Sequence, residues 1–236
     1  MAQNDREERC ENCIVRQFNN LRALNKEELK QVSDAKVTKK VKKGDTLFEE
    51  GEHLNGIFCV RDGVSKLSKL SSNGKDQILK LVTKGEVLGQ SSIISDEKSD
   101  LRATAINDME VCFIPKENIV VPLNNNPKFT MEVLKTMVSD LKESNDAILR
   151  LSQKNVKQRI AQALLYIKTN YGEDDNGYLK LNLSREELAN VVGTAVESCI
   201  RNVSALKKEG LIAISGKKIA LIDSNKLTQF IEDFRH

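Results

Sequence analysis

The chain is poor in aromatic residues and in histidine. It contains no Trp, 4% aromatic residues in all, and 2 His among 236 residues. The aromatic pockets of many enzymes, and aromatic platforms on which single-stranded bases stack, are therefore not expected. Two isolated histidines do not make a metal triad, and the sequence has no nucleophile–base pair and no phosphate-binding glycine loop that opens a helix. These absences argue against an enzyme.

Long hydrophobic runs are also missing. No apolar run approaches the ~20 residues that a membrane-spanning helix needs, and the charged N-terminus lacks the apolar core of a signal peptide. We therefore expect a cytoplasmic protein with no membrane partner. The 5 Cys of such a chain are expected to be thiols or ligands rather than disulfides.

Excess charge of one sign is small. The net charge of +3 is weak evidence for a polyanion partner, and from residue 156 onward 12 Lys and Arg accompany 10 Asp and Glu. A DNA-binding surface would have to come from local patterning rather than bulk charge. The length of 236 residues, with 39% hydrophobic residues, allows two modest domains with packed cores.

The most informative stretch is 184–222, which reads SREELANVVGTAVESCIRNVSALKKEGLIAISGKKIALI. Ser184 and Thr194 are each followed three residues later by a glutamate, which is the pattern of a capping box at a helix start. Gly193 between them allows a sharp turn. The stretch therefore predicts two short helices, a tight turn and a β-hairpin, the layout of a winged helix-turn-helix.

The second of these helices, over 194–208, has the pattern of a recognition helix. One apolar stripe is expected to face the core: Ala195, Cys199, Val203 and Leu206. The opposite face carries Glu197, Ile200, Arg201 and Ser204. Arg201 can donate two hydrogen bonds to guanine, Glu197 can accept from cytosine N4, and Ile200 can touch a thymine methyl group.

The hairpin Leu211–Ile222 favours this interpretation over one in which Glu197 only caps the helix and Arg201 is a solvated charge. Lys217 and Lys218 lie at its turn, where a wing meets phosphate. The sequence therefore predicts binding to double-stranded DNA.

The chain before this region changes its pattern twice. Residues 1–20 form a polar arm with Cys10 and Cys13, and helical spacing with a capping pattern from Asn25 to Glu28 follows over 21–34. From about residue 35 to 114, short strands alternate with glycine-rich turns, which is typical of a β-roll or jelly roll. We assign 21–127 to a β-roll sensor domain.

A long helix, assigned to 128–155 with a continuation expected to about residue 171, carries a heptad seam. Its positions are Leu134, Val138, Leu141, Asn145, Ile148 and Ser152. An Asn in such a seam lowers stability but can fix register and pairing. Because the stripe is long and lies between a barrel and a DNA-binding domain, a parallel dimer helix is favoured over packing on the helix's own roll. A homodimer would present two recognition helices one DNA turn apart. With a winged domain over 156–236, the fold class is α+β.

A β-roll, a long dimer helix and a winged helix-turn-helix in this order resemble the CRP/FNR family of bacterial transcription regulators, over essentially the whole chain. Glu197, Ser198 and Arg201 match the E-[ST]-x-x-R core through which family members read DNA. Val196 resembles the FNR branch, whereas Ile200 departs from the serine found there. The resemblance implies a DNA-binding regulator with RNA polymerase as a partner.

Family members that bind cyclic nucleotides use a G-E-x-x-L segment and an R-S/T pair, which resemble Gly89-Gln90-Ser91-Ser92 and Ser99-Asp100 here. A glutamine replaces the acid, and no arginine occupies the phosphate position, so cyclic AMP is not expected. A different small effector stays open, in a pocket of Gln90, Ser91, Ser99, Ser144 and Asn145.

The Cys10-x2-Cys13 arm and Cys112 before an Ile-Pro strand end resemble the cluster-binding elements of FNR proteins. Thiolates so placed imply an iron–sulfur cluster as cofactor. The third arm cysteine of those proteins is Asn19 here, so three of the four thiolates are present. Cys59 could supply the fourth sulfur, but the family register places it inside a strand, in the core of the roll. An arm carboxylate (Glu7, Glu8 or Glu11) could serve as fourth ligand instead.

Several alternatives stay open at this stage. Cys10 and Cys13 could act as a thiol or disulfide switch without metal, and Cys112 could be an ordinary buried residue. The chain could also be a constitutive architectural DNA-binding protein whose affinity no effector changes. An enzyme's regulatory subunit built on the roll is the least favoured interpretation.

Overall fold

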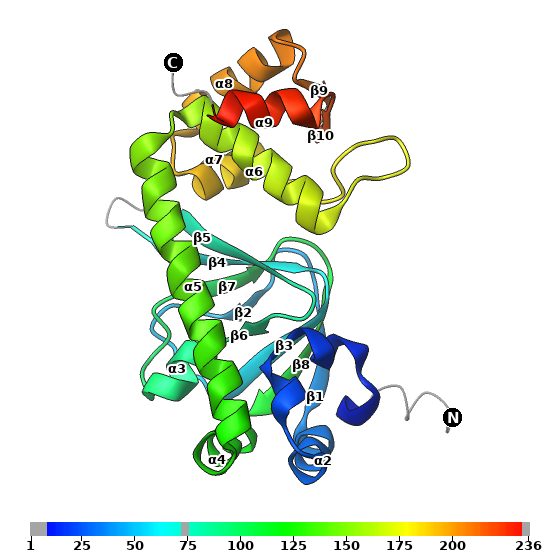
Figure 1. The fold of residues 1–236 in the computed structure, drawn as a ribbon, viewed down its shortest axis with the longest axis vertical. Helices are drawn as coiled ribbons and strands as arrows, with labels where there is room; N and C mark the ends of the chain where they lie inside the picture. Colours follow the sequence, from blue (N-terminus) through cyan, green and yellow to red (C-terminus); the bar gives the residue numbers. More distant parts are fainter. Residues whose placement is uncertain (1–8, 72–75, 233–236) are drawn as a thin grey trace. The chain divides into compact units, whose positions relative to one another are not determined.

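The computed structural model describes residues 9–71 and 76–232. It divides into two compact units, one of residues 1–75 and 79–142 and the other of residues 76–78 and 143–236 (Figure 1). Within the described ranges, no helix is both long and apolar enough to cross a membrane.

The first unit is built around a β-roll of two antiparallel four-stranded sheets with the orders β1-β8-β3-β6 and β2-β7-β4-β5. Gly63 makes the tight β3–β4 turn with φ of 89°, where a Cβ atom would collide with the backbone of Asp108. The strands are β1 (Val37–Val41), β2 (Thr46–Phe48), β3 (Gly56–Asp62), β4 (Val64–Leu70), β5 (Asp76–Thr83), β6 (Val87–Leu88), β7 (Arg102–Ala105) and β8 (Met109–Pro115). The predicted β-roll is confirmed.

Alternation along β3 divides its side chains between two hydrophobic clusters. Phe58 and Val60 belong to the cluster inside the roll, whereas Ile57 and Cys59 belong to a second cluster formed with the arm and the neighbouring helices. The expectation that Cys59 lies in the core of the roll is therefore wrong. Its side chain lies on the outer face of the sheet.

The N-terminal arm, although polar in composition, is folded from residue 9 onward. Three short 3-10 helices, η1 (Cys10–Asn12), η2 (Ile14–Phe18) and η3 (Asn20–Ala23), precede α2 (Lys26–Ala35). Buried Cys10, Val15 and Leu21 join the outer cluster, and these apolar contacts fold the segment. The predicted capping box from Asn25 to Glu28 is present. Figure 1 shows this dark-blue segment beside β1, β3 and β8.

This unit has two further short helices, one between β6 and β7 and one after β8, and they are followed by a long helix that continues into the second unit. They are α3 (Gln90–Ser95), α4 (Glu117–Asn125) and α5 (Pro127–Gln153). Phe129 and Val133 are the buried residues of α5. The expected continuation to residue 171 is interrupted, because Asn155 and Gln158 form a capping box that starts a new helix at Val156.

The second unit contains the predicted winged helix-turn-helix. Its helices are α6 (Val156–Tyr171), α7 (Arg185–Val192), α8 (Val196–Lys208) and α9 (Ser224–Glu232), and the wing is the antiparallel pair β9 (Ile212–Ser215) and β10 (Lys218–Leu221). Ser184 caps α7 in a capping box, as predicted. The second predicted box is wrong, because α8 begins one residue later, with Ala195 as N-cap and no side-chain cap.

Candidate DNA-binding face and cysteine site

Helix α8 buries one apolar stripe and exposes its opposite face. Cys199, Val203 and Leu206 are buried, whereas Ala195 is exposed at the helix start rather than part of the core. The predicted DNA-contacting residues of this helix, which we call the reading face, are exposed or half-buried: Val196, Glu197, Ser198, Ile200, Arg201 and Ser204. Ile200 is 47% exposed although it is a large apolar residue. An exposed isoleucine between two charged side chains suits contact with a base methyl group.

The serines of the reading face differ in how their polar atoms are used. Ser204 Oγ donates to the backbone oxygen of Ile200 (2.9 Å), so its proton is committed to the helix. Asn202 Nδ2 donates to the backbone oxygen of Ser198 (2.8 Å). Ser204 therefore has mainly an acceptor to offer DNA, and Glu197 and Arg201 remain the predicted charged contacts.

The two lysines of the wing are both exposed but differ in their partners. Lys218 Nζ lies 3.0 Å from Asp174 Oδ2 and over the ring of Tyr178. Lys218 and the backbone N–H of Tyr178 hold the pKa of Asp174 below its ordinary value, so this pair stays charged at neutral pH. Lys217 is exposed at the turn itself, and of the two lysines it is the one predicted to be more available to phosphate.

Arg159 on α6 positions the turn of the helix-turn-helix. Its guanidinium donates to the backbone oxygens of Val192 (2.9 Å), Gly193 (3.4 Å) and Lys154 (2.8 Å). Burial lowers the pKa of Arg159 from its ordinary value. No sequence motif points to Arg159. Its neighbours Gln158, Ile160 and Ala161 are buried, and an arginine among buried residues indicates a side chain with a structural role.

Four cysteines from three parts of the first unit line one small cavity, which we call the cysteine site. Cys10 and Cys13 come from the arm, Cys59 from β3 and Cys112 from β8. Cys59 and Cys112 are direct partners in the β3–β8 ladder. The remaining lining residues are Arg16, Leu21, Leu29, Val32, Lys36, Arg61 and Ile114. The structure thus brings the three predicted cysteines together and adds a fourth.

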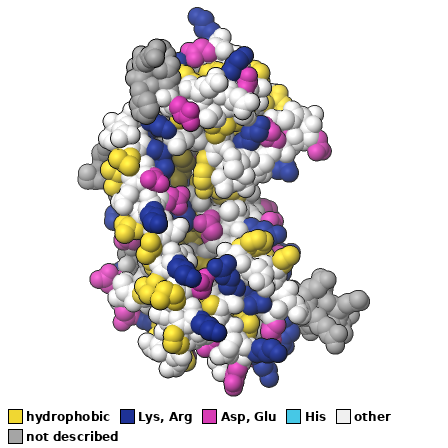
Figure 2. All heavy atoms as spheres, viewed as in Figure 1, with side chains coloured by type: hydrophobic (Ala, Val, Ile, Leu, Met, Phe, Trp, Pro, Cys, Tyr) yellow, Lys and Arg dark blue, Asp and Glu magenta, His cyan; other side chains and the backbone are white. Residues whose placement is uncertain are grey.

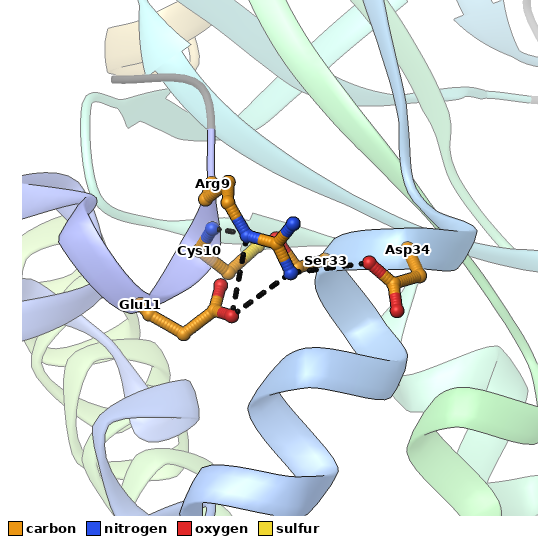
Figure 3. Close-up of polar contacts among 5 residues, drawn as sticks. All are labelled: Arg9, Cys10, Glu11, Ser33 and Asp34. Carbon is orange, nitrogen blue, oxygen red and sulfur yellow. Dashed lines mark hydrogen bonds and ion pairs between the residues drawn. The ribbon is translucent and has the colours of Figure 1, made fainter. Parts of the chain in front are cut away.

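Polar contacts with α2 fix the start of the arm (Figure 3). The backbone N–H of Cys10 donates to Ser33 Oγ (3.0 Å), and Arg9 bridges Glu11 (3.1 Å) and Asp34 (3.2 Å). Glu11 is thus engaged by Arg9 and does not line the cavity. Glu7 and Glu8, the other candidate carboxylates, lie outside the described residues.

Burial keeps two of these thiols protonated. It raises the pKa of Cys10 to about 11, an effect that the charge of Lys36 partly offsets. Burial, with Cys112, Cys13 and Cys10 nearby, raises the pKa of Cys59 to about 12, while a hydrogen bond from Asn19 acts in the opposite direction. Metal binding here must therefore release protons.

The proposed effector residues are divided between the two units. Gln90 is buried and accepts a hydrogen bond from Asn20 Nδ2 of the arm (3.0 Å), and buried Ser99 donates to the backbone oxygen of Leu101 (2.8 Å). Ser91 is exposed on α3, and Ser144 and Asn145 are exposed on α5. Gln90 and Ser99 therefore direct their hydrogen bonds to the protein itself.

Residues 38–124 match the family model for a cyclic nucleotide-binding domain, and residues 158–230 match that for a Crp-like helix-turn-helix domain. The fumarate and nitrate reduction regulatory protein of Escherichia coli K12 is 28% identical over 93% of this chain and 89% of its own length. This chain belongs to the CRP/FNR family. It is accordingly a DNA-binding transcriptional regulator of the CRP/FNR type, and its relatives are regulators, not enzymes.

Further comparisons agree with this membership. The anaerobic regulatory protein of Haemophilus influenzae is 28% identical over 93% of this chain and 86% of its own length. A crystal structure of a CRP/FNR-family protein from Eubacterium rectale superposes with a TM-score of 0.77 and 23% identity, covering 90% of this chain and 97% of the other. That structure supports the fold.

The family resemblance implies an iron–sulfur cluster, and the donors of the cysteine site fit one. Within the described ranges, no three His, Cys, Asp or Glu side chains lie close enough together to hold a single metal ion. A cluster places its thiolates on different iron atoms, so its ligands lie farther apart than those of one tetrahedral ion. The cavity measures about 20 Å³, room for about one water. The arm would therefore have to move outward to admit a cluster.

Proposed function

We propose that this CRP/FNR-family protein is a homodimeric transcription regulator that reads a two-fold symmetric DNA site through α8 and senses oxygen or redox state through an iron–sulfur cluster at the cysteine site. The single observation that carries the sensor is the convergence of Cys10, Cys13 and Cys112 on one cavity. The names of two relatives, an anaerobic regulatory protein and a fumarate and nitrate reduction regulator, agree with this proposal.

The DNA-reading part rests on the reading face and the wing. Arg201 donates to guanine in the major groove, Glu197 accepts from cytosine N4 and Ile200 contacts a thymine methyl group. Lys217 and Lys218 contact phosphate and hold the register of the domain without reading sequence. The expected half-site therefore contains a G·C pair read by Arg201 and Glu197 together.

The homodimer rests on the exposed seam of α5. Leu141 and Ile148 are 61% and 65% exposed, and Leu134 and Val138 are also among the exposed large hydrophobic residues. Figure 2 shows hydrophobic side chains at the surface over α5, interspersed with charged ones. Such a seam does not pack on the helix's own roll, and burial against a second α5 removes it from water.

When bound, the cluster supplies an oxygen-sensitive centre, and the residues of this chain link that centre to the rest of the protein. The arm carries Cys10 and Cys13 and also Asn20, whose side chain holds Gln90 of α3. Arm movement at the cysteines therefore changes the contacts of α3. A change in regulation requires the bound state to favour one conformation by about 1–3 kcal/mol.

Two alternatives for the sensor are less well supported. In a switch between Cys10 and Cys13, the buried Cys10 would be a poor attacking thiolate, because burial raises its pKa to about 11. A small-molecule effector at Gln90 competes with the buried hydrogen bond from Asn20. RNA polymerase is the protein partner that the family implies, and we expect the protein to act in the cytoplasm.

Anaerobic purification tests the sensor. We expect a broad absorption band near ~400 nm together with bound iron and acid-labile sulfide, all of which disappear in air. Binding to a palindrome selected with the anaerobic protein should weaken on exposure to air. The Cys112→Ala variant should lack the band and bind that DNA as the air-exposed protein does.

A colourless, iron-free protein that binds a selected palindrome equally well with and without oxygen would overturn the cluster. That result would leave the DNA-binding assignment intact. It would favour a small effector or a constitutive architectural role.

A further inference from the structure

The cluster proposed above has three ligands in the family pattern, and its fourth is missing from the arm. Asn19 occupies the position of the third arm cysteine. An asparagine amide is a poor ligand for iron in a sulfur-rich cluster, which prefers soft thiolates. A fourth thiolate would therefore have to come from another part of the chain, close to the first three sulfur atoms.

Cys59 is that sulfur. It lines the same cavity as Cys10, Cys13 and Cys112, and it lies opposite Cys112 in the β3–β8 ladder. Side chains directly opposite each other on one face of an antiparallel pair have Cβ atoms about 4.5–5.5 Å apart. Cys59 is 6% exposed, and its side chain lies on the outer face of the sheet beneath the arm.

Asn19 marks the place where the family's missing thiol would be. Its side-chain Nδ2 donates to Cys59 Sγ at 3.3 Å. The arm residue at the family's ligand position therefore touches the thiol of β3 directly. A hydrogen bond from an amide to a cluster ligand is also one of the contacts that set the potential of such a centre.

Positive charge surrounds the four sulfur atoms. Arg16, Lys36 and Arg61 line the cavity, and Arg61 also forms an ion pair with Glu110 at 2.6 Å. Arg16 Nε is buried and finds no hydrogen-bond partner among the described residues. Four thiolates would bring a large negative charge, which these cations would offset, and they would give Arg16 Nε an acceptor.

We propose that Cys59 is the fourth thiolate of the cysteine site, in place of the missing arm cysteine, and that Asn19 is its hydrogen-bond donor. This inference rests on the cluster of the proposed function. It assigns to β3 a ligand that the family pattern places on the arm, so two ligands come from the arm and two from neighbouring strands.

Reconstitution with ferrous iron and sulfide under anaerobic conditions tests the assignment on the full chain. Iron and acid-labile sulfide per chain and the visible spectrum are compared for wild type, Cys59→Ala, Cys112→Ala and Cys199→Ala. Cys199 is a matched control, because it is a buried cysteine in the other unit. Wild type and Cys199→Ala should load equally, whereas Cys59→Ala should lose the iron and the band as Cys112→Ala does.

A relocation variant separates loss of a ligand from loss of packing. Because Asn19 touches Cys59 Sγ, a thiol returned to position 19 should reach the same iron. The double variant Cys59→Ala/Asn19→Cys should therefore regain iron and sulfide that Cys59→Ala has lost. Thermal unfolding of the iron-free variants, followed by circular dichroism, checks that each one folds.

Mössbauer spectroscopy of the wild-type protein loaded with ⁵⁷Fe gives a test that needs no variant. Every iron should have only sulfur ligands, and an iron with an oxygen or nitrogen ligand would overturn the inference. Iron content of Cys59→Ala equal to wild type, with Cys112→Ala empty, would also overturn it and leave the proposed function standing. A wild-type protein that takes up no iron would instead remove the cluster itself.

Discussion

Arg201 and Lys217 are both exposed basic residues, but they are expected to contribute differently to DNA binding. Arg201→Ala should cost about 1–3 kcal/mol on the preferred site and relax preference at one base pair, because a bidentate contact to guanine is lost. Lys217→Ala should weaken binding evenly across sequences. It should also lower the slope of log affinity against log salt concentration by about one unit. Titrations of specific and random duplexes at several salt concentrations separate the two.

The ion pair of Lys218 with Asp174 supplies an internal comparison. Lys218→Ala should change affinity less than Lys217→Ala, since its charge is already partly neutralised. The assignment of reading face and wing would be contradicted if both variants, Arg201→Ala and Lys217→Ala, bound specific and random DNA as wild type does.

Cys199 lies in the recognition helix, yet its thiol is not expected to respond to oxidants. Burial raises its pKa to about 11, although Arg185 acts in the opposite direction. At pH 8 its alkylation by iodoacetamide should be on the order of 100-fold slower than that of a free thiol, because the thiolate is the nucleophile. The rate should still rise about tenfold per pH unit between pH 8 and 9.5.

The sign of the linked stability effect follows from the same pKa. A thiol that keeps its proton in the folded state stabilises the fold below the unfolded pKa of about 8.5. That contribution is lost as pH rises toward 11. Mass spectrometry of digests identifies the alkylated residue, and a rate for Cys199 that levels off below pH 9 would contradict its burial.

At the scale of residues, the positions of side chains can be predicted where a motif or the alternation of a strand determines them, and not where they depend on contacts between distant segments. Cys10, Cys13 and Cys112 converge as the family pattern implied. The expectation that Cys59 lies in the core of the roll is wrong, because alternation in GIFCVRD places Cys59 on the same face as Arg61, and a face with an arginine does not point into a roll. Its contact with Asn19 joins residues 40 positions apart and could not be read from spacing.

At the scale of elements, Arg159 links α6 to the turn between α7 and α8 and to the end of α5. Arg159→Ala should destabilise the protein by about 1–3 kcal/mol, because it leaves carbonyl oxygens of Val192 and Lys154 without their charged donor. Specific DNA binding should fall with it, since the turn orients α8. Urea denaturation and DNA titration measure the two effects.

Arg201→Ala is the matched control for that experiment. It removes an exposed arginine of the same winged domain, so it should leave the unfolding midpoint nearly unchanged while reducing specific binding. Equal denaturation midpoints for Arg159→Ala and wild type would mean that the three hydrogen bonds of Arg159 do not hold the turn.

Most elements were predictable from periodicity and capping, and their ends were not. The box at Ser184 formed because Glu187 reaches back to its backbone N–H. The similar pattern at Thr194 did not form, because the αL conformation of Gly193 and the tight turn leave Ala195, not Thr194, at the N-cap. The interruption before α6 has the same origin, since the box of Asn155 and Gln158 ends one helix and starts the next.

At the scale of the whole molecule, the exposed seam of α5 sets the expected oligomeric state. The double variant Leu141→Glu/Ile148→Glu should convert a dimer to a monomer, because four charges would meet at the seam of the dimer. Sedimentation velocity measures the mass, and affinity for a palindrome should fall because only one recognition helix then binds.

Val121→Glu serves as the control, since Val121 is 52% exposed on α4 and lies outside the seam. It should leave the dimer intact. A wild-type protein that sediments as a monomer at high concentration and still binds a palindrome tightly would contradict the dimer.

The order of roll, long helix and winged domain could be predicted from the sequence because each part has its own hydrophobic period. The residues of the regulatory site could not be predicted in this way, because a set of ligands depends on which faces of the protein meet after folding. The arm illustrates this: its composition is polar, yet Cys10, Val15 and Leu21 bury it against α2 and the sheet.

The pairing of Cys59 with Cys112 has a further consequence for how the cysteine site assembles and comes apart. The β3–β8 ladder fixes these two thiols before any metal arrives, so the roll offers a preorganised half of the site at little entropic cost. The arm half is held by short 3-10 turns and a few polar contacts, and it would have to rearrange to admit the proposed cluster. Opening is therefore expected to begin at the arm, with the strand pair the last to release iron.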